Sequence, residues 1–572
     1  MRAERTDLRA DVLIIGGGSA GMWAAKRLKE LQPELDVLIV EKGPEEWGGL
    51  MHLAGGDFDA VLPGENGDDW VKDVVYYWDG LCEQDVVRDL FAQGYARMQD
   101  YEAMGYQFKR DGQGRLSGVP QRGLEHCRLY PSQEKGKGGR IMAEAMLREM
   151  KRLGVRRMGR TLVTDLIRRD GRVAGAVGFH AVDGTFLTFR ARAVILAAGP
   201  ASWKPGYNSN TSTGEWVELC WKNGVPMRNF ESLVVMNAPK LFFWEGQAIY
   251  LALGGRFVNR LGEPIMDRYS PVLGANTDNN YVCRAMAIEM REGRGPIYLD
   301  ISQIREEDME FVRPQTGNQK KNYDKLKAEG IDFFQDKDIE FIPQVQLTLG
   351  GAVTEPDGST EIPGLYICGR CRSIDYAYMG GFGLSSSAIT GYQTGGAAAD
   401  YLVAAGEDLP LEEAQVEQLR RELYAPMGKG DRKPKEVLVE LQTLMSHYDV
   451  CLLKSEDSLQ AALRELERLR AEELPRMSAD DPHYLLKYKE VEGIFRLTEL
   501  YLQASLARRE SRGAHFRVDY PRLDNEKFLG WIVQRSRDGR LEQTLCPVPA
   551  ERYPFPVDRF YCEENFTFDR NH

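Results

Sequence analysis

The chain has 572 residues, of which 43% are hydrophobic and 28% charged, and its formal net charge is −12 at pH 7. This length allows several domains with large cores, and the acidic balance argues against a nucleic-acid partner, because phosphate contacts need basic surface. No apolar run is long enough to cross a bilayer, so the sequence predicts no membrane span. We expect no secretory signal, and the nine scattered cysteines favour reduced thiols in the cytoplasm.

The first predicted elements are two strands joined through a glycine-rich turn and a helix. An apolar run at 12–15 leads into the segment GGGSAG at 16–21, and a second apolar run at 37–40 ends in Glu41. Strand, glycine turn, helix, strand and acid follow one another as in a dinucleotide-binding unit. A diphosphate is expected at the helix N-terminus, where free N–H groups and the helix dipole favour negative charge.

Individual residues of this segment have expected roles. Gly16 permits the tight turn, Gly18 lets the backbone approach a pyrophosphate, and Gly21 lets the helix pack on the strand. The Glu41 carboxylate can accept hydrogen bonds from both ribose hydroxyls. Because a carboxylate there repels a 2′-phosphate, the sequence favours FAD or NAD over NADP.

Helices are predicted at 84–104 and 139–153, before a region of alternating strands and turns at 161–199. The turns are expected at Asp170-Gly171 and Asp183-Gly184, and the last strand ends in Ala198-Gly199. A hairpin layer followed by a strand that ends in a glycine is typical of a two-dinucleotide-type flavoprotein.

The rest of the chain changes character three times. Residues 220–345 are aromatic and loop-rich, as in an inserted capping domain, and the glycine- and serine-rich theme returns at 343–399. Periodic apolar and charged residues from about 412 predict several helices, and an extended tail rich in proline and aromatic residues follows.

These observations predict an α/β fold with a Rossmann-like FAD domain, an inserted α+β cap and a C-terminal helical domain. The expected boundaries are 1–220 and 343–405 for the FAD-binding domain, 221–342 for the cap, 406–520 for the helical domain and 521–572 for the extended tail. The pair Cys368 and Cys371 has redox spacing, but it follows a strand in a glycine-rich segment, so a packing role is favoured and no metal site is predicted.

The chain resembles a known family in segments that run in the same order from end to end. They are DVLIIGGGSAG, GGLMHLAGGDFDA, ARAVILAAG, GGRFVNRLGEPIMDRYSP, IPGLYICGR and LARRESRGAHFRVDYP. The sequence is similar to the flavoprotein subunits of fumarate reductase, succinate dehydrogenase and adenylylsulfate reductase, with L-aspartate oxidase as a cousin. The resemblance implies FAD as cofactor, a ferredoxin-type iron–sulfur protein as partner and a small-molecule substrate.

Members with covalent FAD have a histidine six residues before the glycine pair, and here Gly49 stands at that position relative to Gly55-Gly56. His52 is out of register, so noncovalent FAD is expected. The expected FAD-binding residues are Gly16, Gly18, Ser19, Ala20, Gly21, Glu41, Lys42, Gly48, Gly49, Gly55, Gly56, Val163, Ala197, Ala198, Gly199, Gly369, Arg370, Ser385 and Ser386.

The resemblance implies that the family's dicarboxylate site has lost most of its cations in this sequence. The family's proton-donating arginine falls on Asn279, five residues before Arg284, and a family histidine falls on Gln346. The histidine and arginine of the HGANR segment fall on Ala377 and Gly381. Because two carboxylates need cationic or strong donor partners, the substrate is expected to be neither fumarate nor succinate.

Six side chains are candidates for substrate placement or proton transfer. A tyrosine can exchange a proton if a cation lowers its pKa, although packing is the plainer role for each tyrosine, and Arg284 could be a structural ion-pair residue. Arg370 could neutralise a pyrophosphate or a reduced flavin, or point to solvent, and His126 could be catalytic. The six candidates are Tyr269, Asn279, Arg284, Gln346, Tyr376 and Tyr378.

Three functions stay open. The first is an oxidoreductase that acts on a small organic substrate and exchanges electrons with an iron–sulfur partner. The second is a flavin electron-transfer subunit without its own substrate, and the third is an oxidase that reacts with oxygen. The charged run at 509–519 is expected to hold the helical domain on the flavin domain, with a direct substrate role as the alternative.

Overall fold

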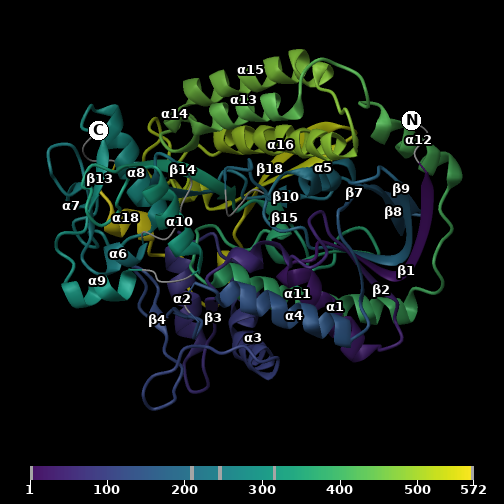
Figure 1. Ribbon diagram of the computed structural model, residues 1–572, viewed down its shortest axis with the longest axis horizontal. Coiled ribbons are helices and arrows are strands. Elements are labelled where there is room, and N and C mark those ends of the chain that lie inside the picture. Colours follow the sequence, from purple (N-terminus) through teal and green to yellow (C-terminus); the bar gives the residue numbers. More distant parts are fainter. Residues whose placement is uncertain (1–3, 135, 207–210, 243–247, 314–316, 569–572) are drawn as a thin grey trace.

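The computed structural model describes residues 4–568 apart from 135, 207–210, 243–247 and 314–316 (Figure 1). Its largest sheet has five strands that run parallel to their neighbours, in the order β6, β2, β1, β9 and β16. These strands are β1 (Arg5–Ile15), β2 (Val37–Val40), β6 (Arg156–Met158), β9 (Phe186–Leu196) and β16 (Leu365–Ile367). Ile15 is in register with both Val40 and Leu196, and Leu196 with Ile367, so the carboxyl ends of four strands meet at one edge.

Residues 186–190 of β9 also pair with an antiparallel hairpin, which consists of β7 (Thr161–Arg169) and β8 (Arg172–His180). The predicted turns at Asp170-Gly171 and Asp183-Gly184 join these strands and are confirmed. The helices predicted at 84–104 and 139–153 are also confirmed, as α3 (Gln84–Ala103) and α4 (Gly138–Arg152).

Two helices pack closely beside the parallel sheet, α1 (Ser19–Leu31) and α11 (Phe382–Ala404). A Cβ atom at Gly391 of α11 would lie 2.3 Å from the carbonyl oxygen of Ala20 in α1. The small residues of the segment at 391–399 therefore let the two backbones touch, and they place the first turn of α1 beside the third turn of α11.

The cap is a sheet in the order β11, β14, β13 and β12, with α8 (Asn279–Arg291) packed on β11 and β14. Its strands are β11 (Leu233–Pro239), β12 (Arg256–Val258), β13 (Ile297–Asp300) and β14 (Glu340–Thr348). Strand β14 continues past the predicted boundary at 342, so one strand links the cap to the FAD-binding domain.

The C-terminal helices form a layer on the side of the molecule away from α1, α4 and α11 (Figure 1). They include α12 (Glu413–Tyr424), α13 (Pro434–Ser446), α15 (Glu456–Glu472) and α16 (Pro482–Ala507), and α16 packs on α5 (Glu215–Lys222). The described helices include none that is long and apolar enough to span a membrane.

The predicted extended tail contains a β-hairpin, β17 (Gly530–Arg537) and β18 (Arg540–Pro547). Strand β17 pairs with β10 (Met227–Arg228), which in turn pairs with β15 (Gly351–Ala352). The tail thus completes a sheet whose other strands come from the middle of the chain. The domain boundaries themselves stay predictions.

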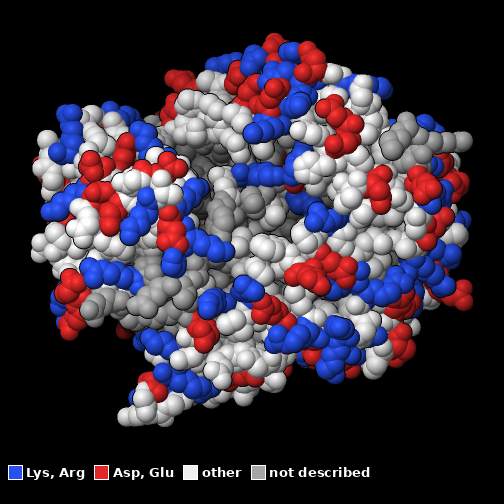
Figure 2. All heavy atoms as spheres, in the orientation of Figure 1, with Lys and Arg blue, Asp and Glu red and all other residues white. Residues whose placement is uncertain are grey.

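The remaining elements are short or lie between those above. They are η1 (Gly49–Leu53), β3 (Phe58–Asp59), α2 (Gly67–Tyr77), β4 (Val119–Pro120), β5 (Arg128–Tyr130), α6 (Ala248–Ala252), α7 (Ile265–Tyr269), α9 (Glu306–Val312), α10 (Gly317–Ala328), η2 (Gly369–Cys371), α14 (Tyr448–Cys451), η3 (Leu474–Arg476), α17 (Asn525–Phe528), η4 (Ala550–Arg552) and α18 (Tyr561–Asn565). Acidic and basic side chains are intermixed over the face shown in Figure 2.

Candidate cofactor and substrate cavity

A cavity of about 340 Å³ opens at the edge where the parallel strands end. It extends from the first turn of α1, past the end of β2, to η1 and the hairpin strand β7, and continues to the first turn of α11. Gln346 and Leu347 of β14 also line it, so the cavity reaches the cap.

Thirteen of the expected cofactor residues line this cavity: Gly16, Gly18, Ser19, Ala20, Glu41, Lys42, Gly49, Gly55, Val163, Ala197, Ala198, Gly199 and Arg370. Six expected residues lie behind the lining: Gly21, Gly48, Gly56, Gly369, Ser385 and Ser386. The hydroxyls of Ser385 and Ser386 donate hydrogen bonds back to carbonyls of their own helix, and the next residue, Ser387, lines the cavity instead.

Two helix N-termini face the cavity without side-chain caps. Gly18 precedes α1 and Gly381 precedes α11, and neither first turn contains an acidic side chain. Gly16 has φ +114°, and a Cβ atom there would lie 2.2 Å from the carbonyl oxygen of Ala197, so the turn before α1 needs glycine. Uncapped N–H groups at both ends suit a diphosphate with an attached ring system.

Glu41 is held at the end of β2 by backbone groups. Its Oε2 accepts a hydrogen bond from Gly17 N at 2.7 Å, and its Oε1 accepts one from Gly43 N at 2.9 Å. Each carboxylate oxygen keeps a second lone pair. Glu41 therefore stays able to accept the hydroxyl hydrogen bonds that the sequence predicts.

Lys42 lies in a cluster that connects the cavity to the helical layer. Its Nζ is 2.6 Å from Glu215 Oε1 and 3.2 Å from Glu490 Oε1 of α16. Glu490 also pairs with Lys204 at 2.7 Å and Lys487 at 3.0 Å. Burial alone would lower the pKa of Lys42, but the two carboxylates outweigh it and raise that pKa, whereas burial lowers the pKa of Lys204 to about 8.

Arg370 does not point to solvent and does not offer a free cation. Its Nη1 donates to both carboxylate oxygens of Asp375, each at 2.7 Å, and both residues line the cavity. The sequence reasoning missed Asp375, although its position five residues after an arginine in the glycine-rich segment could have signalled it. The pair places one charge of each sign at the wall.

Asp57 also lines the cavity and was missed. No hydrogen bond or ion pair of its side chain is found within the described residues, and burial raises its pKa to about 6. Asp59, two residues on, is buried and accepts a hydrogen bond from Gln121 Nε2 at 3.1 Å. Two carboxyls close to the glycine pair were the available signal in the sequence.

The structure brings two of the six catalytic candidates to the cavity, Gln346 and Tyr378. Asn279 lies one layer behind them. Its Nδ2 contacts Met236 Sδ at 3.2 Å, and Met236 belongs to an apolar cluster with Leu347 and Tyr378.

The other three candidates are buried away from the cavity. Arg284 donates to the Gly513 carbonyl at 2.8 Å and stacks on aromatic rings that include Phe516. Tyr269 donates to Glu289 at 2.7 Å within the cap. Tyr376 lies beside Arg508 with its hydroxyl 3.4 Å from Glu231, so all three are packed in structural networks.

Neither histidine considered in the sequence lines the cavity. His52 stacks on the indole of Trp47 at 4.2 Å, and only its neighbours Met51 and Leu53 reach the lining. His126 is 40% exposed at its side chain, so the expected catalytic histidine is not placed at the site.

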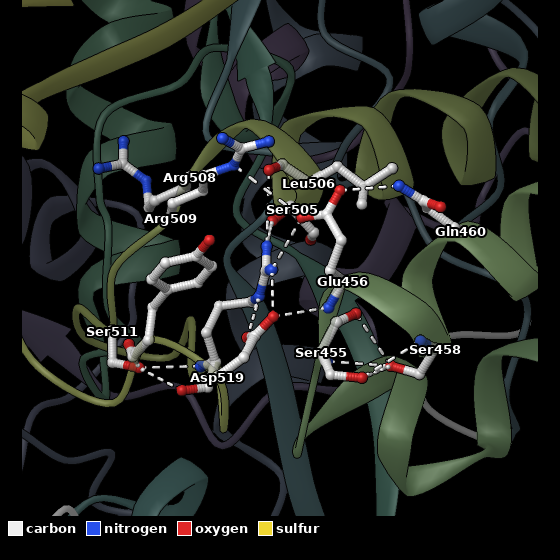
Figure 3. A network of polar contacts seen from close by, with 12 residues as sticks. Ser455, Glu456, Ser458, Gln460, Ser505, Leu506, Arg508, Arg509, Ser511 and Asp519 are labelled. Carbon is white, nitrogen blue, oxygen red and sulfur yellow. Dashed lines mark hydrogen bonds and ion pairs between the residues drawn. The ribbon is translucent and has the colours of Figure 1, made fainter.

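The charged run at 509–519 lies in two adjoining networks. We call Glu231, Arg508, Glu510 and Arg512 the buried arginine cluster, because each of these side chains is 0% exposed and its ion pairs measure 2.8–2.9 Å. Beside it, Arg517 pairs with Asp519 at 2.7 Å and Glu456 at 3.2 Å, and both of these carboxylates are labelled in Figure 3. Arg512 also donates to the Asp79 carbonyl, so the cluster ties the C-terminal segment to the FAD-binding domain.

The fold and the cavity together define a flavin-dependent oxidoreductase. A family profile described as "FAD binding domain" matches residues 11–384, and one described as "Fumarate reductase flavoprotein C-term" matches 439–559. The chain belongs to the FAD binding domain family and is an FAD-dependent oxidoreductase of the fumarate reductase and succinate dehydrogenase type. The resemblance, the fold class and the FAD cofactor expected from the sequence are thereby confirmed.

Relatives match along nearly the whole chain. The fumarate reductase flavoprotein subunit of Mycobacterium tuberculosis is 27% identical over 594 residues, covering 96% of this chain and 99% of that protein. A subunit of the CoM/CoB fumarate reductase of Methanothermobacter marburgensis is 26% identical over 556 residues, covering 92% and 97%. The solved quinol fumarate reductase of Escherichia coli shares the fold, with a TM-score of 0.87 at 24% identity over 97% of this chain and 99% of that one.

Proposed function

We propose that the protein oxidises or reduces a small organic substrate other than fumarate or succinate, and that it exchanges electrons with an iron–sulfur protein. The observation that carries this proposal is the charge of the cavity wall. Among the described lining residues the positive side chains are Lys42 and Arg370, and each is paired with a carboxylate.

Negative side chains outnumber positive ones in the same lining. Four carboxylates, Glu41, Asp57, Glu215 and Asp375, stand against those two cations. A dicarboxylate needs charge-assisted partners in a desolvated site, and both cations of this lining are already paired with carboxylates. The charge favours an uncharged substrate held by neutral groups such as Gln346 and Tyr378.

The residues present fit noncovalent FAD. The uncapped first turns of α1 and α11 would hold the pyrophosphate, Glu41 and the nearby Val163 the adenosine, and Gly199 and Gly55 the ring system. His52 stacks on Trp47 outside the lining, which supports a noncovalent cofactor. When bound, FAD supplies hydride transfer, while the chain positions the substrate and excludes water.

The proposed iron–sulfur partner is supported by the relatives, because two of them are named as subunits of reductases. The chain covers 99% and 97% of these two proteins, including the C-terminal region, so it spans nearly the full length of relatives that are named as subunits. A cytoplasmic location stays a prediction.

The test begins with the purified protein. We expect yellow protein whose flavin is released by denaturation, whose photoreduced flavin is reoxidised by an uncharged compound from a substrate screen, and whose spectrum does not respond to fumarate or succinate. Turnover of fumarate would contradict the substrate proposal. Reoxidation by a co-purified iron–sulfur protein but by no screened compound would favour an electron-transfer subunit, and peroxide release in air would favour an oxidase.

A further inference from the structure

We propose that Asp57 is the proton-exchanging group of the cavity, taking up a proton when negative charge enters the space beside it and releasing that proton when the charge leaves. This inference rests on the proposed function in one respect, because the charge in question is that of the reduced cofactor. The site that binds and releases the proton is a carboxylate of this chain.

The backbone around Asp57 is fixed, and its side chain is directed by that backbone. Tyr106 donates a hydrogen bond from its hydroxyl to the Gly56 carbonyl at 2.7 Å, and Gly139 N donates to the Ala54 carbonyl at 3.1 Å. The segment is thereby clamped between the loop after α3 and the first turn of α4. The Asp57 carboxylate lies over Gly55, where a Cβ atom would be 2.8 Å from Oδ2.

Elimination among the lining carboxylates leaves Asp57. Glu41 accepts two backbone hydrogen bonds, Glu215 pairs with Lys42, and Asp375 is held by Arg370. Protonation of any of these three would break an existing interaction. Asp57 has no such interaction within the described residues, so a proton added to it costs no hydrogen bond or ion pair.

The titratable groups that face Asp57 are both acids. Asp59 on β3 interacts with it electrostatically, as does Tyr106, and burial raises the pKa of each. The first turn of α4 contributes the glycine backbone of Gly138 and Gly139, while Arg140 of that turn is 64% exposed at its side chain and pairs with Glu144 at 2.8 Å. With no cation beside it among the described residues, the ionised form of Asp57 is poorly stabilised, and its pKa of about 6 lies close enough to neutrality for exchange.

The proton balance is simple. When two electrons from an external reductant such as dithionite enter the bound cofactor, Asp57 Oδ gains one proton from water, and reoxidation returns it. No electron moves onto the carboxyl group, and no bond other than O–H forms or breaks there.

A first experiment is independent of flavin. Infrared spectra of the protein stripped of flavin are recorded from pH 4 to 8, comparing wild type, Asp57→Asn and a matched control, Asp85→Asn, which changes an exposed aspartate of α3. We expect a protonated-carboxyl band that titrates near pH 6, is absent in Asp57→Asn and is unchanged in the control. The same titration in all three proteins would overturn the proposal.

A second experiment counts protons. Wild type with bound FAD is reduced with two electrons in weakly buffered solution between pH 6 and 8, and proton uptake is read with an indicator dye. Asp57→Asn should take up fewer protons, up to one per flavin, while Asp57→Glu should restore uptake with a shifted midpoint. Equal uptake by wild type and Asp57→Asn would overturn the proposal, whereas failure of wild type to bind FAD would overturn the proposed function and leave the infrared result to decide on Asp57.

Discussion

The cavity wall and the buried arginine cluster use charge in opposite ways. In the cluster, Arg508, Glu510 and Arg512 are completely buried, and every charge has at least one partner of opposite sign. At the cavity, carboxylates outnumber cations and Asp57 has no partner within the described residues. Charged side chains that have ion-pair partners hold two segments together. A charged side chain without a partner beside a cavity stays available for a ligand or a proton.

This comparison explains where the candidate residues lie. Arg284 and Tyr376 have the side chains of a catalytic site, but both are buried away from the cavity: Arg284 contacts the Gly513 carbonyl and aromatic rings, and Tyr376 contacts Glu231. Residues that exchange protons or bind substrate should therefore be sought beside the cavity, where partners are missing.

The largest effect is expected in the buried arginine cluster. Arg508→Gln leaves Glu231 and Glu510 buried without their common partner, which should lower the free energy of unfolding by about 3–5 kcal/mol. The matched control is Arg509→Gln, because Arg509 is 57% exposed and its ion pair with Glu456 measures 3.9 Å. The control should stay within about 0.5 kcal/mol of wild type in urea denaturation. Equal effects would show that the cluster does not hold the C-terminal segment.

A smaller loss is expected from Glu490→Gln. The variant removes the carboxylate that Lys42, Lys204 and Lys487 share, and the three lysine side chains are only 18–28% exposed. We expect unfolding to become easier by about 2–4 kcal/mol, and FAD to bind more weakly because Lys42 lines the cavity.

The control for Glu490→Gln is Glu492→Gln, since within the described part of the chain Glu492 forms one ion pair, with Lys489, and is 31% exposed. Its effect should be below about 1 kcal/mol, with FAD affinity unchanged in fluorescence titrations. If Glu490→Gln binds FAD as tightly as wild type, the cluster has no part in organising the cavity.

Asp375→Asn should leave the Arg370 side chain in the cavity wall without its ion-pair partner. It frees the guanidinium of Arg370, whose charge Asp375 neutralises through two hydrogen bonds. A dicarboxylate such as malonate should then bind roughly 10- to 100-fold more tightly, the effect of about 1.5–3 kcal/mol from a charge-assisted hydrogen bond. The measurement is the perturbation of the flavin absorption spectrum, and the double variant Arg370→Gln/Asp375→Asn should lose the gain. Equal affinity in the single and double variants would contradict this account.

Local features of the fold could be predicted from the sequence, and long-range ones could not. The turn at Gly16, the helix after it and Glu41 are set by a few adjacent residues, and thirteen expected cofactor residues meet at one cavity. Arg284 contacts Gly513, 229 positions away, and strand β17 pairs with β10 from the middle of the chain. No local periodicity encodes such pairings, so the burial of Arg284 and the hairpin in the tail were not foreseen.

Asp57 shows why part of the site also escaped prediction. Its residue type and its place after Gly55-Gly56 are visible in the sequence, but the absence of a partner is a property of the folded neighbourhood. The same is true of Arg370, for which a role at a pyrophosphate, a role at a reduced flavin and a solvent-facing position stayed open until Asp375 was found against it.

The smallest expected effect concerns the pH dependence of stability. The pKa of Asp57 is about 6 in the folded protein against its usual value of 3.8, so between these values the folded state holds the proton more tightly than the unfolded state does. The contribution of this group to the free energy of unfolding therefore falls as pH rises from about 4 to 6, and ionised Asp57 destabilises the fold above pH 6.

Asp57→Asn removes this penalty, so the protein stripped of flavin should gain about 1–2 kcal/mol at pH 7 and nearly nothing at pH 4. The full difference between the two pKa values corresponds to roughly 3 kcal/mol. The expected gain is smaller, because the Asp57 carboxyl reaches the solvent in the cavity and solvent screens its charge. Urea denaturation at both pH values measures it, with Asp85→Asn unchanged at each. A loss of stability at pH 7 would mean that the carboxylate has a stabilising partner after all. Asp57 would then resemble the paired charges of the buried arginine cluster.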